Sequence, residues 1–167
     1  MRIFPLLLFA FLLPAVLSAQ TPANFSGTWI LDKSASTADL VDVKYDGTVI
    51  RQVQQNASTI SLYELWQKPG ENDFKTASET YKLDGKVRIR KDAIGVRRDS
   101  VRWSQEKKAL TIIRIDTQPL KGTPQEFLVE DTYTLSADGK TLTVDEYSRN
   151  PVTHETKVKR VYTKKGK

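Results

Sequence analysis

The chain has 167 residues, a formal net charge of +6, one histidine and no cysteine. Without cysteine it cannot form a disulfide framework, and one histidine leaves no Cys/His ligand set for zinc, so we expect no metal site and no cofactor. The sequence also lacks a glycine-rich phosphate loop and a Gly-x-Ser-x-Gly elbow. We therefore expect a protein that is not an enzyme.

The N-terminus has the order of features found in secretory signal peptides. Arg2 precedes an apolar run over residues 3–17, and the small residues Ser18 and Ala19 end it. The run is shorter than the roughly 20 residues that a membrane-spanning helix needs. We interpret 1–19 as a cleaved signal peptide and 20–167 as a single domain. The mature protein is then periplasmic or secreted, with no integral membrane segment and no nucleic-acid partner.

Short stretches of alternating apolar and polar residues follow, and this pattern predicts β-strands. We expect strands at residues 27–32, 48–55, 59–67, 74–83, 86–90, 99–105, 109–117, 126–136, 141–149 and 154–163. Asp-Gly pairs at 46–47, 84–85 and 138–139 are strong hairpin signals, and at most one short helix fits, near 36–41. The sequence thus predicts an all-β, antiparallel up-and-down meander. We expect this meander to close into a β-barrel of about 8–10 strands, because closure removes the exposed edges of the sheet. A β-sandwich is the alternative.

The first predicted strand carries a Phe-x-Gly-x-Trp motif at residues 25–29. Gly27 allows close chain approach, and Trp29 is large enough to plug one end of a barrel. At the start of the first strand, this motif resembles the opening of the calycin barrels, which include the lipocalins and the intracellular fatty-acid-binding proteins. The resemblance implies a lipocalin-like barrel with its ligand inside.

The last predicted strand adds a second resemblance. Arg160 and Tyr162 are two residues apart and so share one face of the strand. Residues 159–165 are similar to the last strand of fatty-acid-binding proteins, where an Arg-x-Tyr pair holds the ligand carboxylate. The resemblance implies that role for Arg160 and Tyr162. The helix-turn-helix lid of that family is not evident in residues 33–45, which leaves the ligand class open.

Other strands place a polar residue on an otherwise apolar face. The candidate ligand-binding residues found this way are Arg114, Tyr133 and Glu64, and the same faces carry Asp131 and Glu146. For Arg114 a rival inner face exists, formed by Thr111, Ile113 and Ile115. Buried charges need partners, so two interpretations remain. The acids and arginines form salt bridges that fill the barrel, or the arginines line a water-filled cavity that accepts an anionic ligand.

Together these features predict an exported lipocalin-like protein that binds a small hydrophobic or amphipathic molecule. The resemblance of the last strand adds a carboxylate group on that ligand as one option. The alternative is a non-enzymatic envelope interaction protein with a filled core. Its basic last strand, with Lys157 and Lys159, would make weak contact with anionic surfaces. A third interpretation is a hydrolase in which Glu64 faces Asp131 or Glu146.

Overall fold

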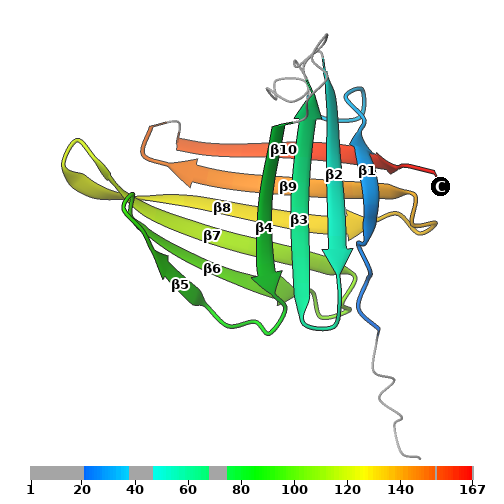
Figure 1. Ribbon diagram of the computed structural model, residues 1–167, viewed down its shortest axis with the longest axis horizontal. Helices are drawn as coiled ribbons and strands as arrows, with labels where there is room; N and C mark the ends of the chain where they lie inside the picture. Colours follow the sequence, from blue (N-terminus) through cyan, green and yellow to red (C-terminus); the bar gives the residue numbers. More distant parts are fainter. Residues whose placement is uncertain (1–20, 38–46, 68–74, 153, 167) are drawn as a thin grey trace, which may run out of the picture.

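The computed structural model describes residues 21–37, 47–67, 75–152 and 154–166 (Figure 1). These residues form ten β-strands in one antiparallel sheet and no helix. The strands are β1 (Gly27–Leu31), β2 (Thr48–Gln55), β3 (Thr59–Gln67), β4 (Lys75–Lys82), β5 (Arg88–Lys91), β6 (Val96–Trp103), β7 (Ala109–Leu120), β8 (Thr123–Leu135), β9 (Thr141–Asn150) and β10 (His154–Lys164). The predicted all-β meander is confirmed. Most of the predicted short helix, and the predicted signal peptide, lie outside the described residues.

The sheet order is β4-β3-β2-β1-β10-β9-β8-β7-β6-β5, so the first and last strands are neighbours and β4 and β5 form the two edges. Figure 1 shows β2, β3 and β4 crossing over the strands β6 to β9. Ion pairs connect β4 to the far half of the sheet, because Glu79 accepts from Arg97 of β6 and Arg114 of β7. The sheet thus wraps around on itself, and its two halves face each other across a common interior.

Two regions differ from the predicted strand boundaries. The predicted strands 86–90 and 99–105 lie instead at β5 and β6, because the Asp92 carboxylate accepts from the backbone N–H groups of Ile94 and Gly95 and closes a turn there. The hairpin of β7 and β8 is longer than predicted. Its turn residues Lys121 and Gly122 have φ of 52° and 80°, which is the backbone of a tight hairpin turn.

The residues that follow β1 extend its pairing with β10. The Asp32 N–H donates to Val161 O at 2.8 Å, and the Thr37 N–H donates to Lys159 O at 2.9 Å. The Ser36 hydroxyl accepts from the Val161 N–H at 2.9 Å. Backbone groups and the Ser36 hydroxyl therefore tie the chain after β1 to β10. The described residues include no helix with the length and apolarity needed to cross a membrane.

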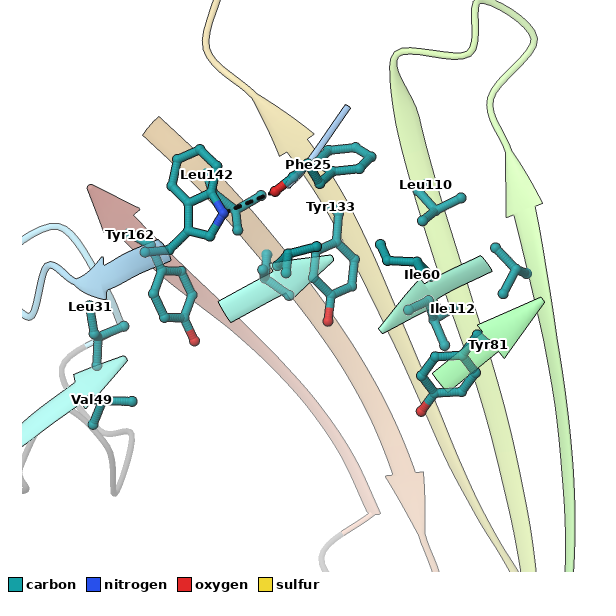
Figure 2. Packing of buried hydrophobic residues seen from close by; sticks show 14 residues of the cluster. Phe25, Leu31, Val49, Ile60, Tyr81, Leu110, Ile112, Tyr133, Leu142 and Tyr162 are labelled. Carbon is teal, nitrogen blue, oxygen red and sulfur yellow. Dashed lines mark hydrogen bonds between the residues drawn. The ribbon is translucent and has the colours of Figure 1, made fainter. Parts of the chain in front are cut away.

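The apolar core fills one end of the barrel (Figure 2). Trp29 is fully buried there, and its indole N–H donates to Phe25 O at 3.0 Å. The Phe25 ring stacks on Trp103 and meets the edge of Tyr133. At Gly27, a Cβ would lie 3.1 Å from the Lys164 side chain. The chain therefore approaches β10 closely at Gly27, and Trp29 sits in the apolar core at this end.

Candidate ligand-binding cavity in the barrel

A cavity of about 410 Å³ lies inside the barrel, beyond the apolar core. Seven strands contribute to its wall, all except β1, β5 and β6. Its lining residues are Arg51, Leu62, Glu64, Ala77, Ser78, Glu79, Tyr81, Arg114, Asp131, Tyr133, Glu146 and Arg160. We call its seven ionisable acid and arginine residues the charged belt: Arg51, Glu64, Glu79, Arg114, Asp131, Glu146 and Arg160.

Strand geometry explains why these charges form a belt. Side chains two residues apart on a strand point to the same face. Each belt residue therefore lies two positions along its own strand from an inward-facing apolar or aromatic residue, as Arg114 does from Ile112 and Glu146 from Val144. Register then places belt residues opposite one another, since Arg51 of β2 lies beside Glu64 of β3. The belt is thus the next layer above the core.

Three buried tyrosines separate the core from the belt. Tyr81, Tyr133 and Tyr162 are at most 2% exposed, and Figure 2 shows their hydroxyl ends directed away from Phe25. The guanidinium of Arg51 lies 5.0 Å from the Tyr162 ring centre and 5.8 Å from that of Tyr133. It also donates a 3.3 Å hydrogen bond to the Tyr133 hydroxyl. The tyrosines therefore hold the belt in place from below.

Each arginine of the belt has a carboxylate partner. Arg51 binds Glu64 at 2.7 Å, and Arg160 binds Glu146 at 2.7 Å. Arg114 differs from these two, because two carboxylates share it, Glu79 and Asp131, each at 3.3 Å. The predicted salt-bridge network is thus present. It does not fill the barrel, since the 410 Å³ cavity remains beside it.

The two carboxylates that share Arg114 have opposite pKa shifts. Burial raises the pKa of Asp131, and the guanidiniums of Arg114 and Arg51 only partly oppose this effect. Burial would also raise the pKa of Glu79, but the Tyr81 hydroxyl donates to that carboxylate and the charges of Arg114 and Arg97 add to it. The pKa of Glu79 is therefore lowered. The neighbours of Asp131 therefore offset the effect of burial on its carboxylate less fully than the neighbours of Glu79 do.

Four of the five predicted ligand-binding residues line the cavity: Glu64, Arg114, Tyr133 and Arg160. The fifth, Tyr162, is fully buried beneath Arg51 and does not line the cavity. Arg114 faces inward with the buried residues Leu110 and Ile112, so the rival face suggested by the sequence is not the inner one.

Several residues of the cavity wall were not predicted from the sequence, among them Arg51, Glu79 and Tyr81. Alternation could have found Arg51, because it stands between Val49 and Val53, both of which are buried. Tyr81 is the one large side chain of β4 that packs in the core, so Glu79 lacked an apolar face to reveal it. Among the described residues no group of three or more His, Cys, Asp and Glu is placed to hold a metal ion.

This architecture is also found among solved protein structures. No protein-family model matches the sequence, and no curated protein matches it. The structure is similar to a solved β-barrel, the REP1-NXSQ fatty acid transporter, with a TM-score of 0.53 over 85% of this chain and 96% of that one. The chain has a calycin-like β-barrel fold. At 12% identity, the similarity to the transporter shows the fold alone.

Other solved structures resemble this calycin-like barrel. A point mutant of the same transporter has a TM-score of 0.50 at 12% identity and covers 84% of this chain and 97% of its own. Human cRBP IV has a TM-score of 0.49 at 15% identity and covers 86% of this chain and all of its own. The transporter carries its ligand class in its name and is not named as an enzyme.

Proposed function

We propose that this calycin-like barrel binds a small amphipathic molecule in its interior cavity. The observation that carries the proposal is the 410 Å³ cavity that the charged belt lines, beyond the apolar core. This volume falls within the range of roughly 300–1,000 Å³ that is usual for small-molecule sites. A wall with Leu62 and Ala77 beside charged groups suits a molecule with one apolar and one polar part.

The fold supports the same function. The REP1-NXSQ fatty acid transporter has the same architecture, and its name assigns it an apolar cargo with a polar end. In our proposal the polar end of the ligand contacts the charged belt, with Glu64, Arg114, Tyr133 and Arg160 as wall residues. The binding of a ligand carboxylate by Arg160 and Tyr162 stays a prediction. A carboxylate ligand would compete there with Glu146, which already binds Arg160 at 2.7 Å.

We also propose that the chain acts outside the cytoplasm, after removal of residues 1–19. The support is the order of Arg2, an apolar run and small residues at the N-terminus. N-terminal sequencing of the protein from a periplasmic or medium fraction tests this. A chain that still begins at Met1 contradicts it.

Native mass spectrometry of protein purified without detergent tests the binding function first. We expect a small molecule bound one to one, which leaves on denaturation and can be extracted. Titration of the emptied protein with a neutral apolar dye, such as Nile red, then reports the cavity directly. Binding that weakens steeply with salt would instead favour a charged outer surface as the site.

A cavity-filling variant locates the site. Ala77→Phe places a ring in the cavity that Ala77 lines, and should abolish dye binding. Thr143→Phe is the matched control, because Thr143 lies between the buried residues Leu142 and Val144 and so faces outward on β9. Dye binding by Ala77→Phe with the affinity of the unchanged protein would show that the cavity is not the site.

A further inference from the structure

Among the described residues, the charged side chains that line the cavity do not balance. Three guanidiniums face four carboxylates in the wall. Behind the wall, Arg97 binds both Glu79 and Asp116, so this pair of described residues adds one charge of each sign and leaves the excess unchanged. With all of these groups ionised, the cavity therefore carries one negative charge more than it carries positive.

This excess is concentrated at Asp131. Glu64 and Glu146 each have a guanidinium at 2.7 Å. Glu79 has Arg97, Arg114 and the Tyr81 hydroxyl.

Asp131 shares Arg114 at 3.3 Å, and its side chain is only 13% exposed. Burial disfavours the charged form of a carboxylate when its guanidinium partner is shared with a second acid, and the raised pKa of Asp131 agrees with this. Asp131 is thus the wall group that gains most from a new positive neighbour.

We propose that the polar end of the ligand is a cation, so that the cavity binds a small amphipathic amine and Asp131 accepts from its ammonium group. This inference rests on the proposed function, and it names the ligand class of the same cavity. An ammonium balances the excess charge, whereas a ligand carboxylate would add a further negative charge in a partly desolvated wall. Because every guanidinium of the belt is already paired, a carboxylate would also have to displace an acid.

Three ligands of equal chain length test the charge of the head group: dodecylamine, dodecanol and dodecanoate. Each displaces Nile red from the emptied protein at neutral pH, below the concentration at which it forms micelles. We expect dodecylamine to bind at least tenfold more tightly than dodecanol, and dodecanoate to bind most weakly. Tighter binding of dodecanoate than of dodecylamine overturns the inference and leaves the proposed function standing. Failure of all three to displace the dye overturns both.

Two variants test the role of Asp131. Asp131→Asn removes the carboxylate and should lower dodecylamine affinity at least tenfold while leaving dodecanol binding within twofold. Glu130→Gln is the matched control, because Glu130 directly precedes Asp131 on β8 and points to the opposite, outer face. The substitution removes the same charge there. Thermal unfolding of each variant is measured first, and Asp131→Ser is a second variant with the same loss of charge. An unchanged preference for dodecylamine in both Asp131 variants refutes the assignment.

Discussion

The Arg51–Glu64 pair allows a quantitative test, because its two side chains differ in exposure. The Arg51 side chain is 10% exposed and that of Glu64 is 30% exposed, at the cavity wall. Glu64→Leu leaves a buried guanidinium without its carboxylate partner, and the Tyr133 hydroxyl and two aromatic rings remain in contact with it among the described residues. An uncompensated buried charge of this kind costs about 3 kcal/mol of unfolding free energy.

The reverse substitution should cost less. Arg51→Met leaves the Glu64 carboxylate, which water in the cavity can solvate. The losses are then one hydrogen bond to Tyr133 and the aromatic contacts, together about 1–2 kcal/mol, partly offset by the apolar methionine. The double variant removes both charges and should lie within about 1 kcal/mol of the unchanged protein. The two effects are thus expected to be strongly non-additive.

Urea unfolding monitored by tryptophan fluorescence measures these free energies, with equal slopes as the check that the unfolded states are comparable. The exposed pair of Arg98 and Glu126 is the control, since its side chains are 40% and 58% exposed and its disruption should change stability little. If Arg51→Met destabilises the protein as much as Glu64→Leu, or if the double variant equals the sum of the two, the argument from burial is refuted.

Three further outcomes follow from the structure. Trp29→Ala removes a fully buried indole and its hydrogen bond to Phe25, and should cost about 3–5 kcal/mol in the same urea assay. Gly95→Ala places a Cβ 2.1 Å from the backbone oxygen of Thr117, so β6 and β7 must separate there; faster amide hydrogen exchange at that end of β7 is the readout. The raised pKa of Asp131 means that the folded state holds this proton more tightly than the unfolded state does. Its contribution to stability is full below the ordinary value of 3.8 and is lost as pH rises through the raised pKa, so Asp131→Asn should gain stability relative to the unchanged protein as pH rises, measured by urea midpoints.

The strand pattern could be predicted because each half-buried strand alternates with a period of two and tight turns punctuate it. The exceptions have local causes. Proline is unfavourable within a sheet, yet Pro119 and Pro124 pair with each other near the turn that joins β7 and β8. The Asp92 carboxylate replaces a longer loop with a compact turn, which no alternation pattern reveals.

The cavity wall could be predicted only in part. Arg114 stood out because it interrupts an apolar face, and Arg160 because the last strand resembles that of fatty-acid-binding proteins; both line the cavity. Their partners depend on which strands the barrel brings together. The contact of Arg114 with Glu79 joins β7 to β4, two strands that do not pair in the sheet. Alternation within one strand carries no information about such a contact.

The division of the barrel into an apolar end and a charged end separates stability from binding. The core around Trp29 and Phe25 buries large apolar side chains, so changes there should lower stability without altering which ligand is preferred. The belt is different, because an ion pair of partly buried groups contributes less to stability than apolar packing of equal volume. Since burial disfavours the charged form of Asp131, a ligand that supplies a positive charge beside it should both bind there and stabilise the fold.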